Sequence, residues 1–216
     1  MTQNQLNVLA EKYLNEYVEI SKSSSPYEIK GIFHSELLMA ITIIGEYHPE
    51  QVIESGRARG QSTEIIARYC GRRNIEFHSV EINKESEDVI IAEKRLEELP
   101  VKLHYGDSFE LIPKLIGDKK TFVLIDGPKG KKMWELSETV LNFPNVLGTL
   151  LHDTPQGTWI RDMIKKRGPH ITSDNSEYVK RFRHLDKICW RVNPWGPYMR
   201  NNKKGKSYGP TLSFIV

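Results

Sequence analysis

Residues 52–63 read VIESGRARGQST, and this short stretch decides the fold. It begins with apolar residues typical of a buried strand, passes through the acid Glu54, and then places Gly56 and Gly60 four positions apart. A strand followed by a glycine-containing turn and a helix is the unit in which α/β proteins hold nucleotide-like ligands. The first question is therefore which ligand this turn accepts.

Two phosphate-binding motifs do not fit the turn. A dinucleotide-binding loop has the pattern G-x-G-x-x-G, but Ala58 and Gln61 take the positions of its second and third glycines. A phosphate loop requires Gly-Lys-Ser/Thr at a fixed distance, and no such triplet follows Gly56. Glu54 would also repel a phosphate group. An acid at this place favours a ligand that carries positive charge near the turn.

Strand and helix patterns alternate through most of the chain, which is typical of a doubly wound α/β domain. We expect strands at 51–55, 75–81, 101–105, 121–126 and 148–153, and helices at 6–18, 34–47, 62–70, 83–99, 107–117, 131–142 and 159–167.

The end of the chain differs, because 188–192 and 211–216 read as two strands joined only by a loop. Parallel neighbours need a long crossover, so we expect these two strands to be antiparallel. The predicted fold is one Rossmann-like α/β domain over 1–216, with a mostly parallel seven-stranded sheet and one antiparallel edge strand. Residues 1–30 form an N-terminal helical extension, and 31–216 form the core.

Composition indicates where the protein is located and what kind of partner it binds. No apolar run is long enough to cross a bilayer, and the N-terminal residues lack a signal-peptide pattern. These two features favour a cytoplasmic protein without a membrane partner. Cys70 and Cys189 have no metal-ligand spacing, which favours a reduced protein. The net charge of +3 is uneven, since residues 161–206 hold 13 Lys and Arg against 4 Asp and Glu. This excess indicates either an anionic partner or a solvated basic face.

Acidic residues collect at the carboxyl ends of the first five predicted strands, where ligands bind in such sheets. They are Glu54, Glu81, Asp107, Asp126 and Asp153. A single acid there would be unremarkable, because acids often cap helices. All five together predict a cleft lined with carboxylates.

The pattern E-x-G-x-x-x-G-x-S from Glu54 to Ser62 resembles the first motif of class I S-adenosylmethionine (SAM)-dependent methyltransferases. It is most similar to their catechol O-methyltransferase-like, small-molecule branch, and the likeness continues in order along residues 30 to 160. SAM carries an ammonium group and a sulfonium, which suits an acid beside the turn. The resemblance implies SAM as cofactor and S-adenosylhomocysteine (SAH) as product.

The resemblance also implies which residues bind the cofactor. They are Glu54, Gly56, Gly60 and Ser62 in the first motif, Glu81 and Ile82 at the ribose, Gly106, Asp107 and Ser108 at the adenine, and Asp126 beside the methionine end. A carboxylate such as that of Glu81 can accept both ribose hydroxyls. Ser62 and Asp107 also suit helix caps. Arg57 and Arg59 are expected to point outward or over the cleft mouth, and no role is assigned to them.

Methyl transfer to a hydroxyl requires alignment and loss of the hydroxyl proton. The resemblance implies that a divalent metal such as Mg²⁺ would bind Asp126, Asp153 and Thr154, although a threonine hydroxyl is a poorer ligand than a carboxylate or amide. His152 is Asp153's neighbour on a predicted strand and should point to the opposite face. The metal-free alternative uses Asp153 or His152 as general base, with Lys129 orienting an anionic acceptor or simply lying exposed in its turn.

The acceptor is left open by the sequence. Aromatic and basic residues alternate in the acceptor loop near 193–210, which suits an aromatic or anionic small molecule, and the resemblance implies a hydroxyl oxygen as the methyl acceptor. The same composition also suits an RNA or nucleotide acceptor, so nucleic acid is not excluded. A non-catalytic binding module with the same fold is a third alternative. The first amphipathic helix can pack on its own domain or on a second copy in a homo-oligomer.

Overall fold

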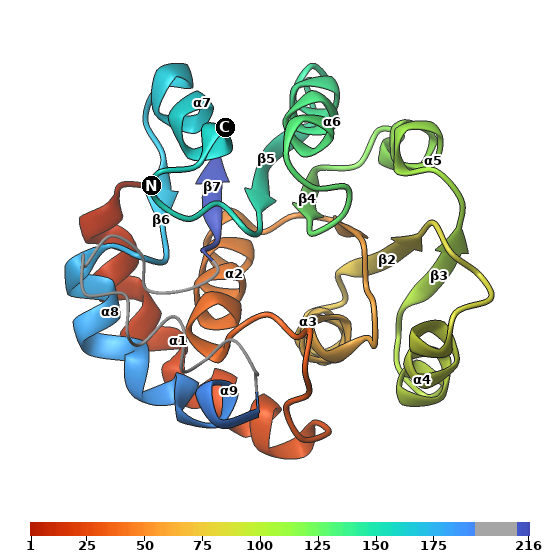
Figure 1. Ribbon diagram of the computed structural model, residues 1–216, viewed down its shortest axis with the longest axis horizontal. Helices are drawn as coiled ribbons and strands as arrows, with labels where there is room; N and C mark the ends of the chain where they lie inside the picture. The colour runs from red at the N-terminus through yellow and green to blue at the C-terminus, as the bar shows by residue number, and fades with distance from the viewer. Residues whose placement is uncertain (193–210) are drawn as a thin grey trace.

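The computed structural model describes residues 1–192 and 211–216, and these contain a seven-stranded sheet of order β3-β2-β1-β4-β5-β7-β6 (Figure 1). Its strands are β1 (Gln51–Ser55), β2 (Glu76–Glu81), β3 (Lys102–Tyr105), β4 (Thr121–Ile125), β5 (Val146–Leu151), β6 (Ile171–Thr172) and β7 (Ser213–Ile215). The first five strands run parallel to one another, and β7 runs antiparallel to both β5 and β6. The predicted mostly parallel, Rossmann-like sheet with one reversed strand is confirmed.

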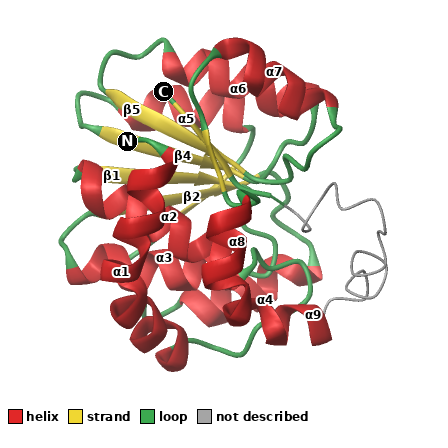
Figure 2. Cartoon of the chain, turned by 90° about the vertical axis from the view of Figure 1, so that its left-hand side faces the viewer, coloured by secondary structure: helices red, strands yellow, loops and turns green. Residues whose placement is uncertain are grey.

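Helices cover both faces of the sheet (Figure 2). They are α1 (Gln3–Ser23), α2 (His34–Tyr47), α3 (Gln61–Arg72), α4 (Glu87–Leu96), α5 (Ser108–Ile116), α6 (Lys131–Leu141), α7 (Trp159–Arg167), α8 (Ser176–Phe182), the 3-10 turn η1 (Arg183–Asp186) and α9 (Lys187–Val192). None of the helices in the described ranges is both long and apolar enough to cross a membrane.

The core is divided by the pleat of the strands, because successive side chains point to opposite faces. Val52 and Phe122 pack in the cluster that contains the buried residues of α1, α2 and α3. Their immediate successors, Ile53 and Val123, pack in the cluster formed with α5, α6 and α7. The sheet is therefore buried on both faces, as the nearly continuous apolar strands predict.

Helix α1 packs on its own chain. Its apolar face, including Leu6, Ala10 and Tyr17, is buried in the same cluster as the interior of α2. Of the two arrangements left open by the sequence, the structure shows the intrachain one, so the N-terminal extension adds a layer to the core.

The predicted strand at 188–192 is wrong, because these residues form α9. Cys189 is buried beside Tyr27 and Phe33, whereas Ile188 and Val192 are 42% and 40% exposed. A short apolar run does not distinguish a strand from a helix by its pattern alone. The strand β7 instead pairs with β5 and with the two-residue β6, which the sequence did not reveal.

Candidate functional site

The turn after β1 meets the turn after β4 at the carboxyl edge of the sheet. Gly56 has φ +84°, and a Cβ on it would lie 2.6 Å from the backbone nitrogen of Gly127. Gly60 has φ +74° and precedes α3 as its N-cap. The two glycines therefore permit left-handed backbone, and Gly56 also permits two loops to approach each other closely.

Glu54 lies inside the sheet and does not border the cleft. Its side chain is 0% exposed, and its carboxylate accepts hydrogen bonds from the hydroxyls of Ser62 (3.2 Å), Thr63 (2.6 Å) and Ser79 (2.7 Å). Burial raises the pKa of Glu54 to about 7. The expectation that Glu54 contacts the cofactor is corrected, because its oxygens are enclosed by these donors. Ser62 is neither the cap of α3 nor a cavity residue, since it donates to Glu54.

Glu81, at the end of β2, joins two loops. Its Oε2 accepts the backbone N–H groups of Arg57 and Ala58, each at 3.2 Å, and its Oε1 accepts that of Ile82 at 2.9 Å. These contacts fix the carboxylate at the edge of a cavity, with the side chain still partly exposed.

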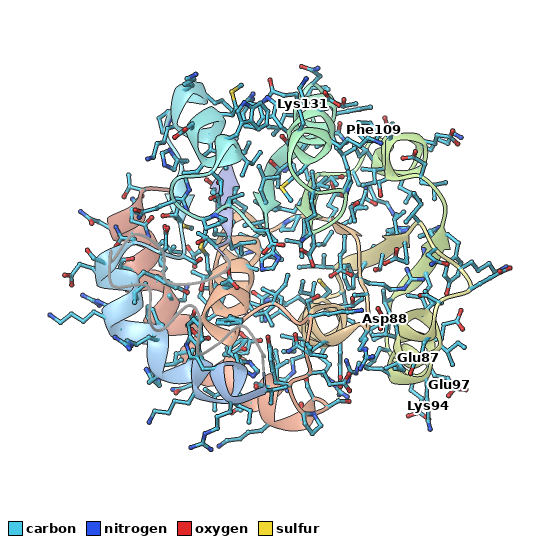
Figure 3. The ribbon with its side chains drawn as sticks, in the orientation of Figure 1. Glu87, Asp88, Lys94, Glu97, Phe109 and Lys131 are labelled. Carbon is cyan, nitrogen blue, oxygen red and sulfur yellow. The ribbon has the colours of Figure 1, made fainter. Side chains whose placement is uncertain are left out.

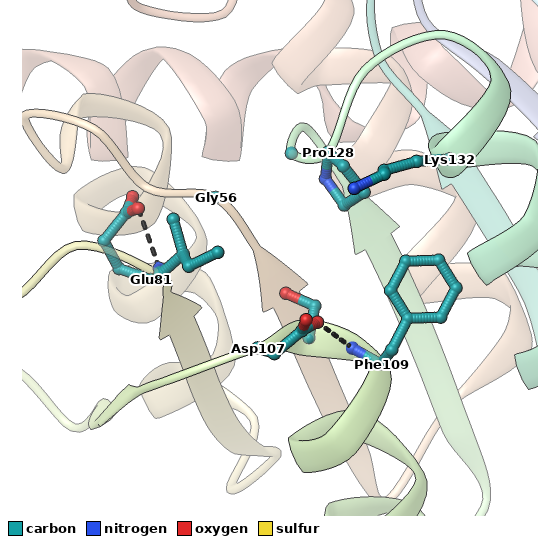
Figure 4. A pocket seen from close by; sticks show the side chains of 9 residues that line it. Gly56, Glu81, Asp107, Phe109, Pro128 and Lys132 are labelled. Atoms are coloured by element: carbon teal, nitrogen blue, oxygen red, sulfur yellow. Dashed lines mark hydrogen bonds between the residues drawn. The ribbon is translucent and has the colours of Figure 1, made fainter.

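The cavity lies between these loops and those that follow β3 and β4 (Figure 4). Its lining residues are Gly56, Glu81, Ile82, Asp107, Ser108, Phe109, Gly127, Pro128 and Lys132. Figure 4 shows Glu81 and Gly56 on one side, facing Phe109, Pro128 and Lys132 across the opening. Five of the predicted cofactor-binding residues line it, which are Gly56, Glu81, Ile82, Asp107 and Ser108.

The lining of the cavity differs in part from the predicted set of cofactor-binding residues. Asp107 is both a lining residue and the cap of α5, because its Oδ1 accepts the N–H of Phe109 at 2.8 Å. Gly60 and Gly106 do not line the cavity. Lys132 and Phe109 were missed, although each follows a predicted strand end by only a few residues, and that position was the available signal.

Arg57 is expected to point outward or over the cleft mouth, but the structure buries it. Its side chain is 2% exposed, donates to the carbonyl of Ser79 at 3.0 Å, and lies over the ring of Tyr105 at 4.6 Å. Arg59 is ion-paired with Asp88 at 2.8 Å, and Figure 3 shows Asp88 on the α3 side of α4. Both arginines therefore hold the loops around the cavity in place.

A second group of charged side chains gathers at the ends of β4 and β5. His152 Nδ1 lies 2.6 Å from Asp126 Oδ1, and Lys129 Nζ contacts Asp126 Oδ1 and lies 2.6 Å from Asp153 Oδ2. The four predicted catalytic residues are thus brought together. The expectation that His152 and Asp153 face opposite sides is wrong, because β5 ends at Leu151 and Asp153 takes a left-handed φ of +58°.

Glu36, at the start of α2, completes this group and was missed in the sequence. Its Oε2 accepts the N–H of Phe33 at 3.1 Å and lies 3.5 Å from His152 Nε2. The side chain is 2% exposed, and burial raises its pKa to about 7. No motif marks Glu36, because its sequence context only indicates the first turn of an apolar helix.

Charges alternate along the group. Although burial opposes it, the neighbouring Asp126 and Glu36 raise the pKa of His152 above its ordinary value. The neighbouring His152 and Lys129 lower the pKa of Asp126, although burial alone would raise it. Both nitrogens of His152 are therefore directed at acidic side chains, which favour its protonated form.

The residues do not fit a divalent metal in the predicted arrangement. Oxygen or nitrogen atoms of Asp126, His152 and Asp153 lie within 4.8 Å of one another, but the Lys129 ammonium bridges the two carboxylates. The third predicted ligand, Thr154, is 0% exposed, and its hydroxyl donates to the carbonyl of Thr211 at 2.9 Å. Thr154 is thus corrected from a metal ligand to a contact with the chain beside β7.

Comparison with known proteins gives structural neighbours only. No protein-family model matches the chain, and no curated protein sequence matches it. A methyltransferase from Podospora anserina, determined with SAH bound, superimposes with a TM-score of 0.52 at 13% identity, over 98% of this chain and 93% of that one. The O-methyltransferase TomG from Streptomyces achromogenes, involved in tomaymycin synthesis and determined with SAM, superimposes with a TM-score of 0.51 at 13% identity, over 100% and 99%.

Similarity at this level of identity establishes the fold. The chain has the Rossmann-like fold of these methyltransferases, as the resemblance in the sequence implies.

Proposed function

We propose that the chain binds SAM in the cavity beside Glu81 and transfers its methyl group to a hydroxyl oxygen of a small-molecule acceptor. One observation carries this proposal. The cavity at the carboxyl edge of the sheet is bordered by two carboxylates, Glu81 and Asp107, and lies beside the charged group that contains Asp126. The two structural neighbours were determined with SAH and SAM, which agrees with it.

The lining residues suit the parts of the donor. A partly exposed carboxylate such as Glu81 can accept both ribose hydroxyls, while its loop contacts hold it in place. Ile82, 72% exposed over the cavity, and Phe109 offer apolar surface to the flat adenine. Gly56 leaves room for the methionine part, and Asp126 lies where the ammonium group of the donor would be attracted.

Transfer is a direct displacement at the donor methyl. The bond from sulfur to methyl carbon breaks as the bond from the acceptor oxygen to that carbon forms, and the sulfur keeps the electron pair. Holding acceptor, carbon and sulfur in line supplies much of the rate. The sulfonium becomes the neutral thioether of SAH.

The acceptor proton has to reach a base on the protein. We assign this role to Asp153, which is 44% exposed toward the solvent side of the charged group. His152 is the less suitable base, since both of its nitrogens are directed at carboxylates. Asp126 then acts as the anchor that holds His152 and Lys129.

The test is transfer of label from SAM carrying a labelled methyl group to a panel of hydroxyl-bearing small molecules, with a carboxyl and an amine panel in parallel. The expected result is labelled ether product only in the hydroxyl panel and loss of at least about 100-fold in kcat for Asp153→Asn, the usual scale for removing a general base. Label appearing only in amines would overturn the assignment of the acceptor, and an unchanged Asp153→Asn would remove that residue from the mechanism.

The basic acceptor loop predicted near 193–210 lies outside the described residues. The labelled-methyl assay therefore has to distinguish aromatic, anionic and nucleotide acceptors.

A further inference from the structure

Lys129 occupies a position between two carboxylates that belong to different loops. Its Nζ contacts Asp126 Oδ1 and lies 2.6 Å from Asp153 Oδ2, so the ammonium joins the loop after β4 to the chain after β5. Two converging carboxylate oxygens are the donors that a hard divalent cation prefers. A cation is thus present at this point, and it is a side chain of the protein.

The rest of the donor set agrees with an ammonium rather than a metal ion. A divalent cation of this kind needs about six ligands, mostly oxygens. The hydroxyl of Thr154 is turned toward Thr211 and Ser213, at 2.9 and 2.6 Å. The Nδ1 atom of His152 is already engaged by Asp126 at 2.6 Å. What remains around the bridge is two monodentate carboxylates, which satisfy two of the three N–H bonds of an ammonium.

We propose that Lys129 takes the place of the divalent metal in methyl transfer, bridging Asp126 and Asp153 and donating its third N–H to the acceptor oxygen. This inference rests on the proposed function. It requires no metal: the acceptor hydroxyl gives its proton to Asp153, its oxygen bonds to the methyl carbon, and sulfur leaves with its electron pair. The ammonium stabilises the charge that develops on the oxygen and keeps its own protons throughout.

The position of Lys129 supports this electrostatic role. The side chain is 50% exposed, so its free N–H can reach a bound acceptor. The other two N–H groups point at the carboxylates of Asp126 and Asp153, so the ammonium is held in place as a donor and a positive charge.

The charge of Lys129 also limits which acceptors suit the site. A single positive charge stabilises an oxyanion less than a divalent ion does. The preferred acceptors are therefore hydroxyls that lose their proton readily, such as phenols, rather than aliphatic alcohols.

The primary experiment measures metal binding, because it needs no acceptor. Mn²⁺ is titrated into wild type, into Lys129→Met, and into Lys129→Met/Thr154→Asn, with free Mn²⁺ followed by electron paramagnetic resonance. Wild type should show no saturable binding at millimolar Mn²⁺. The double variant should gain saturable binding, because the bridge is removed and an amide oxygen is added beside Asp153. Lys131→Met, an exposed lysine at the start of α6 (Figure 3), is the matched control and should behave as wild type.

The same samples separate this inference from the proposed function. SAH should raise the melting temperature of all four proteins, which shows that each is folded and binds the donor. With the first acceptor identified, wild-type kcat should be unchanged by EDTA, Lys129→Met should lose about 100-fold, the scale for one oxyanion donor, and Lys129→Arg should recover part of it.

Saturable Mn²⁺ binding by wild type, or loss of its activity in EDTA with recovery on adding Mg²⁺, would overturn the inference and leave the proposed function standing. Absence of any SAH-induced shift in wild type would instead overturn the proposed function itself.

Discussion

Glu54 shows how an acid in this sequence can serve the fold rather than the ligand. The sequence predicts that it contacts the cofactor, because an acid beside the turn suits the positive charge of SAM. The structure instead surrounds its carboxylate with three hydroxyl groups, from Ser62, Thr63 and Ser79. Two of these donors lie in α3 and one in β2, so Glu54 joins three elements directly behind the cavity.

The raised pKa of Glu54 gives a pH dependence. Its carboxyl group has a pKa of about 7 when folded against 4.5 otherwise, so its contribution to stability is complete below about pH 4.5 and is lost as pH rises through about 7. Glu54→Gln has no such loss. The free energy of unfolding of Glu54→Gln relative to wild type should therefore increase between pH 5 and pH 8, by on the order of 3 kcal/mol at most.

Urea unfolding at the two pH values measures this difference. Glu97→Gln, an exposed residue after α4, is the control and should show no pH-dependent difference from wild type. Equal differences at both pH values for Glu54→Gln would show that Glu54 is ionised in the folded protein like an exposed acid.

At the scale of elements, the turn after β1 determines how close two loops can lie. Gly56 and Gly157 have nearly the same φ, +84° and +83°, but of the two only Gly56 would place a Cβ against another chain segment, 2.6 Å from the nitrogen of Gly127. Nothing lies within 4 Å of the corresponding point at Gly157. Comparing the two glycines therefore separates the cost of a left-handed backbone from the cost of a clash with Gly127.

Gly56→Ala should therefore destabilise the protein more than Gly157→Ala. We expect roughly 1 kcal/mol for the left-handed strain that both share, and a further loss of about 1–3 kcal/mol for the clash with Gly127. Thermal unfolding measures the difference. Gly56→Ala should also weaken SAH binding, whereas Gly157→Ala should leave it unchanged; equal effects of the two variants on stability and binding would contradict the close approach.

The sequence predicted elements well where a pattern ran long and failed where it was short. The alternating strands and helices from 51 to 167 are present because each apolar run is bounded by turn residues. The strand predicted at 188–192 is α9, and β6 has only two residues, so neither had a usable period. In the site, the acids predicted at strand ends fall into two places: Glu81 and Asp107 line the cavity, and Asp126 and Asp153 lie in the charged group. Glu36 came from a distant helix, which local patterns cannot place.

At the scale of the whole molecule, α1 is part of the main core. Leu6 is 0% exposed against α2, whereas Val8, two residues on, is 64% exposed. Leu6→Ala should lower the free energy of unfolding by about 2–5 kcal/mol, because it leaves a cavity in a packed cluster. Val8→Ala should stay within about 0.5 kcal/mol of wild type. Urea unfolding followed by circular dichroism measures both, and a separate early transition in Leu6→Ala would show that α1 unfolds independently.

Isothermal titration with SAH measures whether this molecule holds a SAM-type donor at Glu81. Wild type should bind one SAH per chain. Glu81→Gln should bind roughly 10- to 100-fold more weakly, since charged hydrogen bonds contribute about 1.5–3 kcal/mol, while Glu97→Gln should match wild type. No measurable SAH binding by folded wild type, or equal binding by Glu81→Gln, would contradict the account.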